Sequence, residues 1–248
     1  MSIKTTIAAG VVAAASTLST ASAEELTKRV LVYGDSNAWG WVPIAEGFPT
    51  TRLPDAERFA GVMQAALGDG YEVVVDGLNN RTTDIDDPQD WGNVPMRSFN
   101  GAADLPAAIA REMPLDLVII MLGTNDVKAG FERTPERVAE GAMALALIAK
   151  ESQGVATAYA APKVLVVTPP PFGAFGVEAF AQFYAGGDAK SAAFSATFAD
   201  AGKAAEVRIF DARDAMGATS GIDGVHFSLE DHTQLGSALA TEVSSILK

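Results

Sequence analysis

Cysteine is absent from the 248-residue sequence, histidine occurs only twice, and 31 acidic residues outnumber 18 basic ones. The absence of cysteine excludes disulfide bonds, thiolate catalysis, Cys-ligated zinc and iron–sulfur clusters. Two histidines, His226 and His232, argue against a multi-histidine metal site. The formal net charge of -13 argues against nucleic acid or an anionic membrane as a partner.

The first 23 residues differ from the rest of the chain. Lys4 gives a positive start, residues 7–18 are apolar or small, and Ala21 and Ala23 are the small residues of a cleavage site. The pattern predicts a secretory signal peptide over residues 1–23, with export to the periplasm or the medium. The alternative is an N-terminal helix of the fold. A transmembrane helix is excluded, because the apolar run is too short to cross a bilayer. No cysteine is available for lipid attachment, so we expect no membrane anchor.

From residue 24 onward, short β-branched runs alternate with longer alanine-rich stretches. This alternation predicts one α/β domain over residues 24–248, with three layers, helix–sheet–helix, around a parallel sheet. Strands are predicted at residues 29–33, 71–76, 117–122, 164–168 and 207–210. Helices are predicted at residues 55–67, 135–151, 188–205 and 229–247.

Two connections are longer than packing requires, at residues 78–104 and 169–187. Both follow predicted strand ends, where open α/β sheets place ligands and active sites. The second connection carries three prolines and then a group of aromatic residues, Phe172, Phe175, Phe180, Phe183 and Tyr184. We expect this aromatic group to be local core, with a pocket wall as the alternative.

A serine follows the first predicted strand in the sequence Gly34-Asp35-Ser36-Asn37. A strand end that turns toward a helix is a natural position for a nucleophile, although the same residues also form ordinary turns and helix caps. The segment is not the G-x-S-x-G elbow of α/β-hydrolases, because Ala38 stands where the second glycine is required. Ser36 is therefore a nucleophile only if a base can reach it.

The candidate base is His226, which lies just before the last predicted helix, three residues after Asp223. At that spacing, Asp223 can bind one imidazole nitrogen while the other faces a serine. The alternative is a turn or cap aspartate beside a buried, satisfied histidine. His232 lies within the last predicted helix, and we expect it to be exposed on the surface.

Asparagines follow two of the predicted strands. Asn125 comes after the third strand, where its side-chain amide can donate to an oxyanion, although Gly-Thr-Asn-Asp also forms ordinary turns. The polar segment Gly77-Leu78-Asn79-Asn80 after the second strand can supply a backbone N–H.

The order of these landmarks resembles the SGNH (GDSL-type) hydrolase family over the whole of residues 24–248. Within the family, the chain resembles the arylesterase/acyltransferase (perhydrolase) branch at Gly34-Asp35-Ser36 together with residues 39–43, and at residues 81–88, 115–126 and 163–171. The resemblance implies a flavodoxin-like five-stranded sheet of order 2-1-3-4-5. It also implies that no metal or cofactor is required.

The resemblance implies Ser36 as nucleophile, His226 as general base and then acid, and Asp223 as its orienting carboxylate. The oxyanion hole would comprise the backbone N–H groups of Ser36 and Asn80 and the side chain of Asn125. Most of the wider family has glycine where Asn80 stands. A side chain is therefore added beside the oxyanion site.

Positions that line the acyl channel in this branch correspond to Trp41, Thr124, Lys128, Phe180 and Tyr184, with Asn37 beside the nucleophile. Asn37 is polar where an apolar residue is usual. Core packing is the alternative for the three aromatic residues. For Lys128 we expect a solvated charge, and for Asp35 and Asp126 a structural role in the two turns.

Together these features predict an exported serine esterase that acts on small carboxylic esters through an acyl-enzyme, with water or an alcohol as acceptor. Acyltransferase or perhydrolase activity is a further expectation, and the resemblance implies association of subunits. The alternatives within the family are a carbohydrate O-deacetylase, a thioesterase or a lysophospholipase. The alternative outside enzymes is a catalytically silent binding module.

Overall fold

A computed structural model describes residues 27–89 and 91–248, so the predicted signal peptide lies outside the described residues. One sheet of five parallel strands runs in the order β2-β1-β3-β4-β5, which confirms the expected topology. The strands are β1 (Lys28–Gly34), β2 (Tyr71–Gly77), β3 (Leu117–Met121), β4 (Lys163–Thr168) and β5 (Arg208–Asp211). Each lies within one or two residues of its predicted position.

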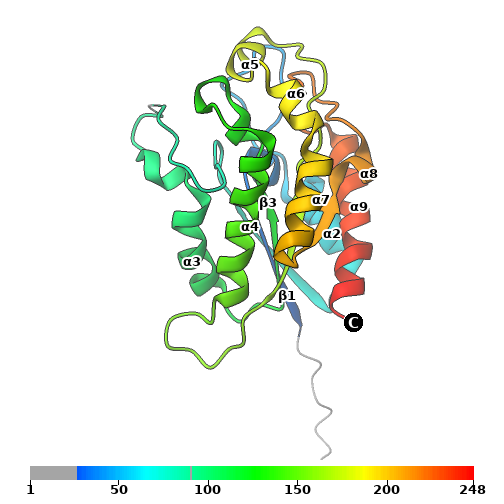
Figure 1. The fold of residues 1–248 in the computed structure, drawn as a ribbon. Helices are drawn as coiled ribbons and strands as arrows, with labels where there is room; N and C mark the ends of the chain where they lie inside the picture. Colours follow the sequence, from blue (N-terminus) through cyan, green and yellow to red (C-terminus); the bar gives the residue numbers. More distant parts are fainter. Residues whose placement is uncertain (1–26, 90) are drawn as a thin grey trace, which may run out of the picture.

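Helices cover both faces of the sheet, giving the three layers predicted from the sequence (Figure 1). One face packs against α3 (Gly101–Glu112), α4 (Pro135–Glu151) and α7 (Phe194–Ala205). The other packs against α2 (Phe59–Leu67), α8 (Ala212–Met216) and α9 (Leu229–Ile246). All five residues of β3 are buried, as expected for a parallel strand covered on both sides.

Short helical segments complete the fold and lie mostly in the loops. They are α1 (Ser36–Trp39), α5 (Glu178–Phe183), α6 (Gly187–Ala192), and the 3-10 turns η1 (Asp55–Glu57), η2 (Met96–Phe99), η3 (Asn125–Val127) and η4 (Ala129–Phe131). Within residues 27–89 and 91–248, no helix is long and apolar enough to cross a membrane.

Three helix predictions need correction. The helix predicted at residues 188–205 is broken at Ala193, whose N–H bonds to Lys190 three residues back, in the tighter 3-10 manner. The helix predicted at residues 55–67 begins only at Phe59, because Arg58 has extended backbone angles. Helix α3 was not predicted, since Gly101 and Pro106 are poor helix formers.

The first three strands end at the same level along the sheet. Gly34, the last residue of β1, is paired with Gly77 of β2 on one side and Met121 of β3 on the other. The turns that follow these strands therefore start side by side at one edge. This edge carries the candidate site.

The structure shows that the predicted exposure of His232 is wrong. Its side chain is fully buried between α9 and α2, where the ring stacks on Phe59 at 6.1 Å between centroids. The backbone N–H of Phe59 donates to His232 Nδ1 at 3.1 Å. A neutral imidazole is required to accept this bond, and burial lowers the pKa of His232 to about 4.

This burial predicts a pH-dependent stability. The pKa of His232 in the folded protein, about 4, lies below its ordinary value of 6.5. The stabilisation is therefore present above pH 6.5 and is lost as the pH falls toward 4. We expect His232 to lower the free energy of unfolding by about 2 kcal/mol between pH 7 and about pH 5.

The measurement is urea unfolding at both pH values for the wild type and His232→Asn, whose side-chain oxygen can accept the same bond. Buried carboxyl groups with raised pKa values act in the opposite direction in both proteins, so the difference between the proteins isolates His232. An equal pH dependence in the two proteins would contradict this account.

Candidate active site

Ser36 is the first residue of the short helix α1, and one residue, Asp35, separates it from the end of β1. The side chain of Asp35 caps this helix by accepting the backbone N–H of Asn37 at 2.9 Å. Burial raises the pKa of Asp35, and the bond from Asn37 opposes that shift. Asp35 therefore has the structural role expected of it, and it fixes the backbone that carries the serine.

A continuous chain of hydrogen bonds joins the serine to a buried carboxylate. Ser36 Oγ lies 2.9 Å from His226 Nε2, and His226 Nδ1 lies 2.8 Å from Asp223 Oδ2. The other oxygen of Asp223 accepts the backbone N–H groups of Val225 and His226, at 2.9 and 2.8 Å. Burial raises the pKa of Asp223, but its bonds to His226 outweigh burial and the pKa lies below its ordinary value. An ionised Asp223 fixes the orientation of the imidazole.

Two features hold the turn that carries His226. Gly224 has a positive φ of 80°, and a Cβ there would lie 2.7 Å from the Ala174 carbonyl oxygen, so the position requires glycine. Asn37 binds both residues that flank the histidine, accepting from Phe227 N–H at 3.0 Å and donating to the Val225 carbonyl at 3.4 Å. Asn37, the polar residue next to Ser36, thus anchors the turn that carries His226.

Ser36, Asn80 and Asn125 line one cavity, and each has an N–H group available to a ligand. Within the described residues, the backbone N–H groups of Ser36 and Asn80 have no hydrogen-bond acceptor. The Asn125 amide donates one N–H to the Arg81 carbonyl at 3.1 Å, and its oxygen accepts the Tyr184 hydroxyl at 2.8 Å. Because a primary amide carries two N–H bonds, one remains for a ligand. This arrangement can bind an oxyanion.

Arg81 secures the turn after β2 to the sheet. Its buried guanidinium donates to the Gly34 carbonyl at 2.9 Å and to Asp76 at 2.7 Å, and it lies 4.0 Å from the centre of the Tyr33 ring. The turn that carries Asn80 is therefore fixed to the end of β1, one residue before Asp35.

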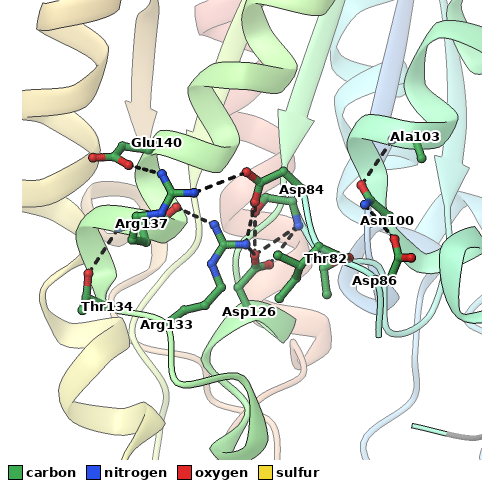
Figure 2. A network of polar contacts seen from close by, with 12 residues as sticks. Thr82, Asp84, Asp86, Asn100, Ala103, Asp126, Arg133, Thr134, Arg137 and Glu140 are labelled. Carbon is green, nitrogen blue, oxygen red and sulfur yellow. Dashed lines mark hydrogen bonds and ion pairs between the residues drawn. The ribbon is translucent and has the colours of Figure 1, made fainter. Parts of the chain in front are cut away.

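A second network joins the turn after β2 to the turn after β3 (Figure 2). The Asp126 carboxylate accepts both the backbone N–H and the hydroxyl of Thr83, at 3.0 and 2.5 Å. Arg133 contacts Asp126 at 3.4 Å and Asp84 at 2.5 Å. Burial raises the pKa of Asp126 to about 6, and the bonds from Thr83 oppose the shift. The expected structural role of Asp126 is thus to hold the two turns together.

A cavity of about 520 Å³ opens above Ser36 and His226. Its lining is predominantly apolar: Trp41, Phe48, Pro49, Leu78, Trp91, Val94, Phe99, Phe180, Phe183 and Tyr184, with Asn79, Asn80, Asn125 and Lys128 as polar members. Trp41 stacks on the His226 ring at 4.7 Å between centroids, and Phe180 meets it edge-on at 5.3 Å. These rings cover the imidazole.

Four of the predicted channel residues line this cavity: Trp41, Lys128, Phe180 and Tyr184. Asn37 and Thr124 are not among the lining residues. Asn37 instead holds the His226 turn, and Thr124 is one of the groups that lower the pKa of Asp35 against the effect of burial. The expectation of a solvated Lys128 is wrong. Its side chain is only 7% exposed and pairs with Asp87 at 3.0 Å.

Sequence reasoning did not single out Phe48, Leu78, Trp91, Val94 or Phe99 as lining residues. Four of these five residues lie in the long connection after β2, whose length was the available signal. The aromatic residues of the second long connection, residues 169–187, form the expected local core only in part. Phe172 packs in the core, whereas Phe183 lines the cavity.

Residues 32–232 match the GDSL-like lipase/acylhydrolase family. The chain belongs to this family. It is therefore a carboxylic ester hydrolase of the SGNH type, as predicted. A search of curated proteins found no match.

Solved structures similar to this SGNH hydrolase support the same assignment. An aryl esterase from M. smegmatis is 44% identical, with a TM-score of 0.84, over 89% of this chain and 100% of the other. A carbohydrate acetylesterase from Sinorhizobium meliloti is also 44% identical, with a TM-score of 0.83, over 88% and 99%. A putative arylesterase from Agrobacterium tumefaciens is 35% identical, with a TM-score of 0.74, over 89% and 100%.

The bond from Tyr184 to Asn125 generates a prediction. Replacing Tyr184 by Phe leaves the buried Asn125 oxygen without its donor and frees the amide to rotate. The amide is then held only by its bond to Arg81 and is less well oriented toward the oxyanion, so we expect kcat for ester hydrolysis to fall about tenfold, less than the loss of a whole donor. Steady-state kinetics of Tyr184→Phe measure this, with Tyr159→Phe, at an exposed tyrosine, as the matched control. An unchanged kcat in Tyr184→Phe would contradict the role of this bond.

Proposed function

We propose that this hydrolase is a serine esterase of small, apolar carboxylic esters that works through an acyl-enzyme. The observation that carries the proposal is the hydrogen-bonded series Ser36, His226 and Asp223, which opens into a largely apolar cavity. No metal or cofactor enters the reaction.

In the first half-reaction, Ser36 Oγ attacks the ester carbonyl while His226 Nε2 takes the hydroxyl proton. Asp223 stabilises the imidazolium that results. The carbonyl oxygen becomes an oxyanion and accepts the N–H groups of Ser36, Asn80 and Asn125. Collapse of this intermediate breaks the bond to the leaving alcohol, which receives the proton from His226.

In the second half-reaction, water or an alcohol attacks the acyl-enzyme. His226 takes the proton of this acceptor, and the same three N–H groups bind the second oxyanion. The carboxylic acid or the new ester then leaves, and the proton returns to Ser36. One set of groups serves both halves because the two intermediates share their geometry.

The roles of the two histidines can be separated. Ser36→Ala and His226→Ala should each lower kcat by at least about a thousandfold with the fold retained, because each removes a group that acts on reacting atoms. His232→Asn at pH 8 serves as the matched control and should change kcat by less than about threefold, because His232 lies outside the cavity. Hydrolysis of 4-nitrophenyl acetate, with circular dichroism as the check of folding, measures all three. Equal losses at both histidines would show that the base is misassigned.

A carbohydrate O-deacetylase is the second candidate, since one similar structure is described as a carbohydrate acetylesterase. The cavity favours the first candidate. Its lining is predominantly apolar, and a sugar would leave hydroxyl groups there with few partners. Thioesterase and lysophospholipase activities use the same chemistry and differ only in the leaving group.

Apolar walls also favour alcohols over water as the acceptor, because burial of each CH₂ group contributes roughly 0.8 kcal/mol. We therefore propose acyltransferase activity beside hydrolysis. Phe48 and Val94 line the cavity and remain 50% and 40% exposed. Association of subunits across these residues would exclude more water from the cavity.

One assay tests substrate class and acceptor together. With 4-nitrophenyl acetate and dilute butanol in water, we expect butyl acetate to form beside acetic acid. We also expect kcat/KM for 4-nitrophenyl acetate to be at least about tenfold above that for acetylated xylose. Early product ratios from gas chromatography give the partition. Formation of acetic acid alone would contradict the acyltransferase activity and leave hydrolysis as the only reaction. A preference for acetylated xylose would favour the deacetylase.

We propose that the protein is exported and that Glu24 is the first residue of its mature form. The proposal rests on the Lys4 start, the apolar run and the small residues before Glu24. Mass spectrometry of the protein from its native host should find residues 1–23 missing. Retention of these residues would overturn both the signal peptide and the export.

A further inference from the structure

Lys128 is a buried cation in the wall of the active-site cavity. Its ammonium donates to Asp87 Oδ2 and to Asn80 Oδ1, each at 3.0 Å, and lies 5.2 Å from the centre of the Trp91 ring. Burial lowers the pKa of Lys128, and the charge of Asp87 opposes the shift. A buried ammonium without such partners is costly, so these contacts confine it to one position.

The Lys128 side chain joins the turn after β3 to the turn after β2. Lys128 directly follows η3, the turn that begins with Asn125, and its backbone N–H donates to the Asn125 carbonyl at 3.4 Å. Its side chain then binds Asn80, on the turn after β2. The segment that supplies the Asn125 amide therefore also holds the residue that supplies the neighbouring donor.

Asn80 requires a stabilising side-chain contact because its backbone has a positive φ. Its φ is +67°, a left-handed conformation that costs free energy in residues with a Cβ, although asparagine tolerates it better than most. The direction of its backbone N–H depends on this conformation. Asp87, the other partner of Lys128, is fixed in turn by the Gln89 backbone at 2.9 Å and by Trp91 Nε1 at 3.0 Å.

We propose that Lys128 is a positioning residue for the oxyanion hole and acts through Asn80 without contacting the substrate. Its bond to the Asn80 side chain keeps the backbone left-handed and the N–H of Asn80 directed at the oxyanion. Asp87 supplies the charge that keeps the ammonium in place. The inference rests on the proposed function, because it assigns the Asn80 N–H to that hole.

A double-mutant cycle tests the coupling. Lys128→Met should lower kcat for 4-nitrophenyl acetate about tenfold, with KM within about twofold, less than the loss of a whole oxyanion donor. Glycine adopts positive φ without cost, so Asn80→Gly removes the need for the side-chain bond. In the Asn80→Gly background, Lys128→Met should therefore change kcat by less than about threefold.

Arg133→Met is the matched control. Arg133 is also a buried cation, 7% exposed, and pairs with Asp84 and Asp126, but it has no contact with Asn80. Its kcat loss should be the same in the wild-type and Asn80→Gly backgrounds. Thermal unfolding of every variant confirms that the proteins are folded at the assay temperature.

Asn80→Ala removes the same bond from the other side and keeps the left-handed strain, so it should have a lower kcat than Asn80→Gly. This comparison tests the proposal even if Lys128→Met does not fold. Equal kcat losses for Lys128→Met in both backgrounds would overturn it, and so would an effect on KM alone, which indicates direct substrate contact.

Failure of the proposed function has a different signature. If the wild type hydrolyses no ester, the esterase assignment falls, but the coupling is still measured by thermal unfolding. Lys128→Met should then lower the midpoint more in the wild type than in Asn80→Gly. Equal shifts of the unfolding midpoint in the two backgrounds would show that the bond between Lys128 and Asn80 does not stabilise the left-handed backbone.

Discussion

The candidate site depends on one constraint, the common level at which three parallel strands end. Gly34, Gly77 and Met121 are in register, so the turns after β1, β2 and β3 begin side by side. Each turn carries one part of the chemistry proposed above: Ser36 as the nucleophile, Asn80 as the backbone donor and Asn125 as the side-chain donor. Only the base and its carboxylate come from elsewhere, from the loop before α9. A shift of one residue in either pairing would separate these groups.

Polar contacts between the turns convert this coarse alignment into defined positions. Arg81 ties the second turn to the first, Asn125 and Asp126 tie the third to the second, and Asn37 ties the histidine loop to the nucleophile. Most of these atoms are buried, so each bond resists solvent competition. The machinery is therefore organised before substrate arrives, which is the condition for electrostatic catalysis.

Local signals predicted the strands, from apolar runs, and the pairing of Asp223 with His226, from their spacing. The strand order and the roles of Ser36, His226 and Asp223 followed from the resemblance to the SGNH hydrolase family. The sequence did not predict the burial of His232 or Lys128. Both depend on partners far along the chain, Phe59 and Asp87, that only the fold brings near. Part of the cavity wall was missed for the same reason, since residues such as Trp91 and Phe48 carry no motif and lie in irregular loops.

In the proposed function, Ser36 is a nucleophile whose reaction generates an oxyanion facing Asn80 and Asn125. The most direct measurement is a crystal structure of the protein after reaction with diethyl 4-nitrophenyl phosphate, whose covalent adduct with serine is a stable mimic of the tetrahedral intermediate. This assignment predicts a phosphoryl group on Ser36 Oγ whose oxygen accepts the N–H groups of Ser36, Asn80 and Asn125. A label on another residue, or a phosphoryl oxygen turned away from Asn80 and Asn125, would contradict it.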